Sequence, residues 1–187
     1  FRHESRMRLK KSLATLSKER DFILIDTPPR LGFELTTALL AATHYLVPVF
    51  ASRYDTDGLT RLTSTVKKIR QRANTGLKLL GVVLGNYDPH TTLHKQIRDT
   101  LRGTFKEHFF STVIHRSIKH AEATFAKQTI YEHAAGHQSA TQFEELTAEV
   151  LAQVFKMLEV ETPRPARAAA AVEVVEPEQA AGAVGEV

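Results

Sequence analysis

The sequence has 187 residues, of which 42% are hydrophobic and 25% charged, which suits one domain with a substantial core. It contains no cysteine, so disulfides are excluded and any zinc site would have to use His, Asp and Glu. It shows no run of 18 apolar residues and no signal peptide, so we expect a cytoplasmic chain that does not span a membrane.

The chain opens with a basic amphipathic segment. Residues 5–19 place four apolar side chains on an approximate helical stripe, which predicts a helix. The stripe consists of Met7, Leu9, Leu13 and Leu16.

An apolar run, FILIDTPP, fills residues 22–29. It is short and ends in two prolines, so it predicts a fully buried strand of a parallel sheet. Asp26 then falls at the carboxyl end of that strand, where open α/β sheets bind ligands. A hydrated Mg²⁺ on a nucleotide phosphate could meet this carboxylate. Alternatively, Asp26 caps the following helix, and the motif alone leaves both interpretations open.

Strands and helices alternate along the rest of the chain. Proline at position 48 cannot donate a ladder hydrogen bond, so we expect an irregular strand there. The alternation predicts an α/β fold with a doubly wound, mostly parallel sheet and helices on both faces. The predicted elements are helices 34–43, 57–73, 92–108 and 139–159 and strands 45–50, 77–86 and 111–114.

The pattern stops near residue 160. Residues 161–187 are rich in Ala, Pro and Glu and cannot bury enough surface to offset their ordering entropy, so we predict a disordered tail after a domain over 1–160. From residue 160 onward, five Glu oppose two Arg, which leaves residues 1–159 with a net charge of +7. The tail also lacks the basic amphipathic pattern of a membrane-surface helix.

Residues 21–59 resemble the ParA family of partition ATPases and, more loosely, their MinD-like relatives. The matching features are D-x-P-P at 26–29, Gly32, an Ala/Leu-rich helix, VPV at 47–49 and the triplet at 57–59. The resemblance continues through 79–97 and 112–133 and covers roughly residues 10–157. It implies a P-loop NTPase fold, incomplete here, in which Asp26 acts in catalysis by holding Mg²⁺ through water on bound ATP.

The phosphate loop of that family has no counterpart in this sequence. Such a loop needs glycines whose amides approach phosphates and a lysine for the outer phosphates. No glycine precedes Asp26, because the first is Gly32. In the family this loop lies upstream, so we expect the chain to be the carboxyl-terminal part of a longer ATP hydrolase. By itself it should neither bind ATP tightly nor hydrolyse it.

The residues after the third and fourth predicted strands are candidates for contact with the nucleoside. The amide of Asn86 can pair with the adenine edge, although Asn in GNYDP could equally stabilise a turn. After the fourth strand the family commonly has Pro-Arg, where this chain has His115-Arg116. The resemblance implies nucleoside contact by Arg116 and makes His115 a second candidate. It also matches Glu122 to a residue that we interpret as structural.

Basic residues recur on helix 92–108 at steps of three and four, which places them in one row. Phosphate contacts need only mobile cations on one surface, but a solvated helix face gives the same pattern. Because ParA-like proteins bind DNA non-specifically through this region, the resemblance implies DNA binding. The candidates are Lys95, Arg98, Arg102 and Lys106 in the row, followed by Arg116 and Lys119.

Two histidine pairs have i, i+4 spacing, as in helical zinc sites. They are His90 with His94 and His133 with His137. Neither pair encloses the Glu of H-E-x-x-H, and a proline or glycine interrupts each segment, so we predict no zinc site.

The resemblance implies a complete functional cycle for the intact protein. ATP closes a homodimer, the dimer coats nucleoid DNA in the cytoplasm, and a ParB-like partner stimulates hydrolysis during plasmid or chromosome partition. One alternative is a non-enzymatic ParA-fold module that binds DNA or a partner. Another is a MinD-like membrane positioning ATPase, which the acidic tail disfavours.

Overall fold

The computed structural model describes residues 2–28 and 30–158. The predicted tail at 161–187 lies outside the described residues. The longer elements are α1 (Arg2–Leu16), α2 (Phe33–Ala41), β1 (His44–Phe50), α3 (Arg53–Arg72), β2 (Lys78–Tyr87), α4 (Thr92–Phe105), β3 (Phe109–His115), α5 (Ile118–Ala126) and α7 (Gln138–Leu158). Two short helices, η1 (Lys106–His108) and α6 (Ile130–His133), complete the described part.

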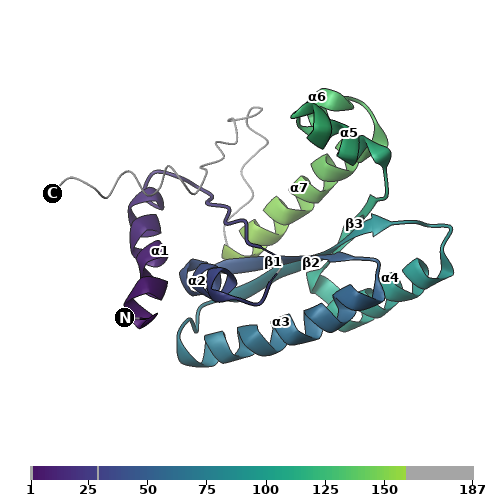
Figure 1. Ribbon diagram of the computed structural model, residues 1–187. Helices are drawn as coiled ribbons and strands as arrows, with labels where there is room; N and C mark the ends of the chain where they lie inside the picture. Colours follow the sequence, from purple (N-terminus) through teal and green to yellow (C-terminus); the bar gives the residue numbers. More distant parts are fainter. Residues whose placement is uncertain (1, 29, 159–187) are drawn as a thin grey trace.

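The three described strands form one parallel sheet in the order β1-β2-β3. Helices α3 and α4 cover one face of this sheet, and α7 covers the other (Figure 1). The predicted α/β fold with a parallel sheet between helices is therefore confirmed.

Each face of the sheet has its own core. On the α3/α4 face, Val82 and Leu84 of β2 are fully buried and pack against Ile97 and Leu101 of α4. On the α7 face, a second cluster joins the sheet to that helix. Its buried members are Leu80, Val83, Phe110, Ile114 and Val154. These cores fix β2 and β3 and thereby the loops that follow them.

The predicted buried strand over residues 22–29 is the main difference between expectation and structure. Residues 22–28 have no strand assignment, and Phe22 and Leu24 are 48% and 86% exposed. A strand is stable only when its backbone groups pair with a neighbour, and within the described part of the chain this segment pairs with no strand of the sheet. The prediction of a buried strand here is therefore wrong for this structure.

Strand β1 is irregular near its start rather than at its proline. Its register with β2 shifts between Tyr45 and Leu46, while Pro48 itself stays paired with Val83. Within the described sheet β1 is an end strand, where the missing N–H of proline is tolerated.

Helices α5 and α6 were not predicted. Both begin at a side-chain cap: the Ser117 hydroxyl accepts from the Lys119 N–H, and Thr129 with Glu132 forms a capping box. The T-x-x-E spacing of that box is visible in the sequence and could have located α6. The predicted helix 92–108 ends early, because Lys106 has a φ of 47° and η1 follows.

Side chains of α7 bond the outer edge of β3. The N–H of Thr112 donates to Glu149 Oε2 at 3.2 Å, and the N–H of His115 donates to Gln142 Oε1 at 3.0 Å. The hydroxyl of Ser111 also bonds Glu149. These bonds satisfy edge groups that would otherwise be open to another strand.

Replacing Gln142 by leucine should destabilise the fold. Gln142 is 6% exposed, so the change leaves the His115 N–H without its acceptor, at a cost of about 1–3 kcal/mol. Urea unfolding measures the effect. The matched control is Gln138→Leu, at an exposed position of the same helix, which should be nearly neutral. Equal stabilities of the two variants would contradict this role of the bond.

Candidate functional site

The carboxyl ends of the three parallel strands lie at one edge of the sheet. They are Phe50, Tyr87 and His115. Ligands of open α/β sheets bind outside this edge. The candidate nucleoside residues Asn86, His115 and Arg116 lie at the ends of two of these strands, so the topology places them at the same edge.

Tyr87 connects the elements at this edge. Its ring is 3% exposed and lies 5.6 Å from the His115 ring and 6.2 Å from the His94 ring, measured between centroids. Arg98 Nη1 donates to the Tyr87 hydroxyl at 3.1 Å. The Tyr87 carbonyl accepts from the Arg116 N–H at 2.9 Å. One buried side chain and its backbone thus tie β2, α4 and the end of β3 together, a role that sequence spacing did not reveal.

Asn86 has a left-handed backbone with a φ of 51°. Asn adopts this conformation more readily than most residues, and here it falls inside β2, where the register with β3 shifts between Leu84 and Tyr87. Its side chain is nevertheless exposed, and among the described residues its amide has no hydrogen-bond partner. Asn86 therefore presents its amide at the carboxyl end of β2.

The loop after β2 is fixed by a local network around Asp88. Its carboxylate accepts from the His90 N–H at 2.8 Å and from the Thr91 hydroxyl at 3.2 Å. The bond from the His90 N–H is the main cause that lowers the pKa of Asp88. The Asp88 N–H in turn donates to His94 Nδ1 at 2.9 Å, so that nitrogen is unprotonated. A turn held in this way keeps Asn86 and Tyr87 in place.

Asp26 and Arg116 are both exposed. Among the described residues, no hydrogen bond or ion pair joins Asp26 to the residues at the sheet edge. The described structure therefore brings together Asn86, His115 and Arg116, but it shows no contact between these residues and Asp26.

The predicted basic row is not a uniform set of cations. Lys95, Arg102 and Lys106 are exposed. Arg98 instead pairs with Asp99 at 2.9 Å, and its side chain is only 34% exposed. Lys119, beyond the row, pairs with Glu122 at 2.7 Å. Two of the predicted DNA contacts therefore already have anionic partners within the protein.

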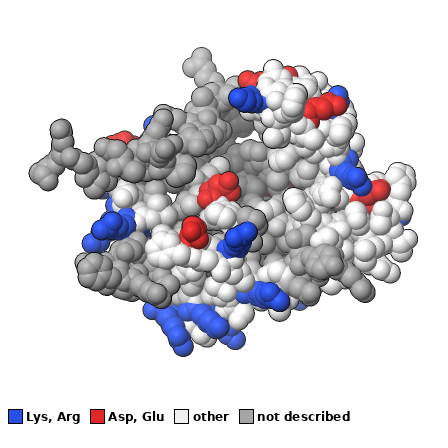
Figure 2. Space-filling view, in the orientation of Figure 1, with Lys and Arg blue, Asp and Glu red and all other residues white. Residues whose placement is uncertain are grey.

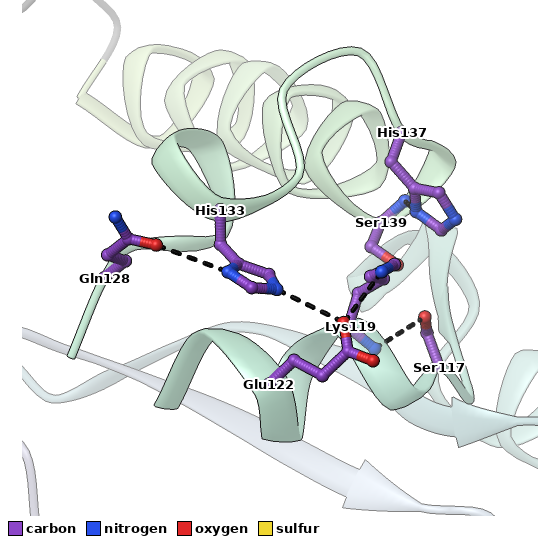
Figure 3. Close-up of polar contacts among 7 residues, drawn as sticks. All are labelled: Ser117, Lys119, Glu122, Gln128, His133, His137 and Ser139. Atoms are coloured by element: carbon purple, nitrogen blue, oxygen red, sulfur yellow. Dashed lines mark hydrogen bonds and ion pairs between the residues drawn. The ribbon is translucent and has the colours of Figure 1, made fainter. Parts of the chain in front are cut away.

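Glu122 joins α5 to α6, as Figure 3 shows. Its Oε2 accepts from Lys119 Nζ and also lies 3.2 Å from His133 Nε2, while His133 Nδ1 lies 3.3 Å from Gln128 Oε1. Lys119 first and His133 second lower the pKa of Glu122. These contacts support a structural interpretation of Glu122.

Each of the two histidine pairs contains a ring that bonds another group of the protein. His137 Nδ1 accepts from the Ser139 N–H, whereas His133 faces Glu122 (Figure 3). In the other pair, His94 Nδ1 accepts a hydrogen bond from the Asp88 N–H. Within the described residues, no group of three or more His, Asp or Glu side chains is placed to hold a metal.

The chain is similar to known partition ATPases. The family profile described as "AAA domain" matches residues 2–79. The chain is 38% identical to the chromosome-partitioning ATPase Soj of Thermus thermophilus, over 72% of this chain and 54% of that protein. It is 35% identical to the chromosome partitioning protein ParA of Myxococcus xanthus, over 66% and 44%. The chain thus spans about half the length of these curated relatives.

Solved structures share the fold. The cell division ATPase MinD of Pyrococcus furiosus superposes with a TM-score of 0.62 at 22% identity, over 78% of this chain and 57% of that one. Cobyrinic acid a,c-diamide synthase of Mycobacterium smegmatis, with a bound ATP analogue and magnesium, gives 0.63 at 23%, over 84% and 57%. A plasmid partition protein of Borrelia burgdorferi gives 0.55 at 23%, over 81% and 53%.

Within the described residues, no helix is long and apolar enough to cross a bilayer.

The ordered motifs, the parallel sheet and the sequence identity to chromosome-partitioning ATPases all indicate one family. The chain belongs to the ParA family of partition ATPases.

Proposed function

We propose that the protein containing this chain is an ATP-dependent partition ATPase that acts on plasmid or chromosomal DNA. The observation that carries this proposal is the shared sheet edge, where Asn86 directly precedes buried Tyr87 and the Arg116 N–H donates to the Tyr87 carbonyl. An exposed amide and an exposed guanidinium at the carboxyl ends of parallel strands fit the base and ribose of a nucleotide.

The residues present fit the nucleoside end of ATP better than its phosphates. The Asn86 amide is exposed and, among the described residues, unpaired, so it can both donate to and accept from adenine. Asp26 would hold Mg²⁺ through water, and that ion would neutralise the β- and γ-phosphates. Glycines for the phosphates would come from sequence beyond this chain, since the chain matches only about half the length of its relatives.

The remaining steps of the proposed cycle follow from the family. ATP would close a homodimer that binds DNA non-specifically, and a ParB-like partner would stimulate hydrolysis and release. The exposed cations Lys95, Arg102 and Lys106 would contact DNA phosphates. Arg98 and Lys119 would first have to leave Asp99 and Glu122. The protein would act in the cytoplasm on the nucleoid, without a membrane.

The nucleoside contact is tested by Asn86→Gly in the full-length protein. Glycine keeps the left-handed backbone and removes only the amide. Losing hydrogen bonds of about 0.5–1.5 kcal/mol each should weaken binding of a fluorescent ATP analogue several-fold and reduce the preference for adenine over guanine nucleotides.

Lys127→Gly is the matched control, because Lys127 also has a positive φ of 54° but lies at the end of α5. It should leave nucleotide affinity unchanged. Wild-type affinity in Asn86→Gly would remove Asn86 from the site. A full-length protein that binds DNA but no ATP would instead favour the non-enzymatic module.

A further inference from the structure

Helix α3 carries a strongly basic outer surface to which the proposed function assigns no role. From Gly58 to its end, the helix contains no acidic residue. In Figure 2, Lys and Arg side chains gather along the lower edge of the molecule, where α3 runs in Figure 1. We call this surface the α3 basic face, and it consists of the exposed residues Arg61, Lys67, Lys68, Arg70 and Arg72.

The helical spacing arranges these cations on two flanks of the helix. Arg61, Lys68 and Arg72 follow one another at seven and four residues and share one flank, while Lys67 and Arg70 lie on the other. Eleven residues of helix rise about 16 Å, a length over which duplex DNA presents several phosphates. The spacing of the α3 basic face therefore suits a run of phosphates rather than a single anion.

The charges of the α3 basic face are not matched inside the protein. Among the described residues, none of its five cations forms an ion pair, in contrast to Arg98 on α4. The opposite side of the helix is anchored by Val66 and Ile69, which are 3% and 8% exposed in the core shared with α2. The cations thus project from a helix that the core holds in place, and no internal pair must break before they bind.

The other exposed side chains of α3 indicate which polyanion fits. Among the residues of α3 whose side chains are described, they are hydroxyl and amide groups, at Thr60, Thr63, Ser64 and Gln71. None of the described residues of α3 is an exposed large hydrophobic side chain. Binding to a bilayer surface or to a protein partner uses apolar anchors, whereas phosphate contacts use cations and small polar groups.

We propose that the α3 basic face binds the phosphate backbone of duplex DNA independently of base sequence. The inference rests on DNA as the proposed partner but not on the nucleotide site. Since α3 and α4 cover the same face of the sheet, this surface would extend DNA contact beyond the row on α4 (Figure 1).

The test is Lys68→Glu/Arg72→Glu in the full-length protein, with a random-sequence duplex as the probe. Fluorescence anisotropy at several salt concentrations should show affinity at least tenfold weaker and a log–log salt dependence shallower by about two, because about two phosphate contacts are lost. Lys127→Glu/Lys156→Glu makes the same change in net charge on two exposed residues, one directly after α5 and one in α7. This control should retain most of the affinity.

The outcomes separate this inference from the proposed function. Equal losses of DNA affinity in both double variants would show a general effect of net charge. They would overturn the proposal that the α3 basic face binds DNA. So would wild-type binding to anionic vesicles but not to the duplex. If the wild-type protein binds DNA equally well with and without ATP, the proposed ATP-dependent cycle is contradicted. The proposal that the α3 basic face binds DNA is not affected by that result. Should the reversal variant misfold by circular dichroism, Lys68→Gln/Arg72→Gln makes the same test with a smaller expected loss.

Discussion

Asp26→Ala in the full-length protein should reduce Mg²⁺-dependent ATP turnover by about 10–100-fold or more, as for other residues that orient a catalytic metal through its water ligands. The carboxylate would bind water molecules of the hydrated ion and so place it on the outer phosphates. The effect is measured as the rate of phosphate release at a series of Mg²⁺ concentrations. A weakened metal site should also raise the Mg²⁺ concentration needed for the half-maximal rate.

The control for this prediction is Asp21→Ala, which removes an exposed carboxylate five residues earlier in the same stretch of chain. It should leave turnover near the wild-type rate, because its position does not match the family's metal-binding aspartate. Near-normal turnover of Asp26→Ala would exclude Asp26 from the metal site. The alternative, that Asp26 caps a helix, would then be favoured.

The sequence predicted those elements whose local pattern and tertiary partners agree. The apolar run at 77–86 is strand β2 at Lys78–Tyr87, paired on both sides. The equally apolar run at 22–28 is not a strand. An apolar pattern indicates that a segment tends to be buried, but it does not indicate whether a neighbouring strand is present to pair with it. Parallel topology was enough to predict that Asn86 and Arg116 share an edge. Periodicity thus predicts the element, but pairing depends on the rest of the fold.

Side-chain partners distant in sequence were beyond sequence reasoning. Helical spacing placed Arg98 in the basic row, but its partner Tyr87 lies on a strand eleven residues away. Likewise, the amide of Asn74, two residues after α3, donates to the carbonyls of Leu39 and Ala42 at 2.8 Å, which ties α3 to the end of α2. Such contacts decide whether a cation or an amide is available to a ligand.

Gly81→Ala should be among the most destabilising single substitutions in the sheet. A Cβ at this position would lie 2.6 Å from Phe110 Cζ and 3.0 Å from the His108 carbonyl oxygen. Phe110 is 7% exposed and packed beneath α7, so its ring cannot move aside without opening that core. Overpacking of this kind typically lowers the free energy of unfolding by about 1–3 kcal/mol. Here the added Cβ would also crowd a backbone atom, the His108 carbonyl oxygen.

Gly103→Ala provides the opposite expectation from the same substitution. Gly103 lies in α4, and nothing stands within 4 Å of its added Cβ, so alanine should stabilise the helix by up to about 1 kcal/mol. Thermal unfolding should therefore move in opposite directions for the two variants. Adding Phe110→Leu to Gly81→Ala should cost less than the two single changes combined, because the smaller side chain relieves the clash. If Gly81→Ala melts at or above the wild-type temperature, β2 and β3 are not packed as described, and the edge that unites Asn86, Tyr87 and Arg116 loses its support.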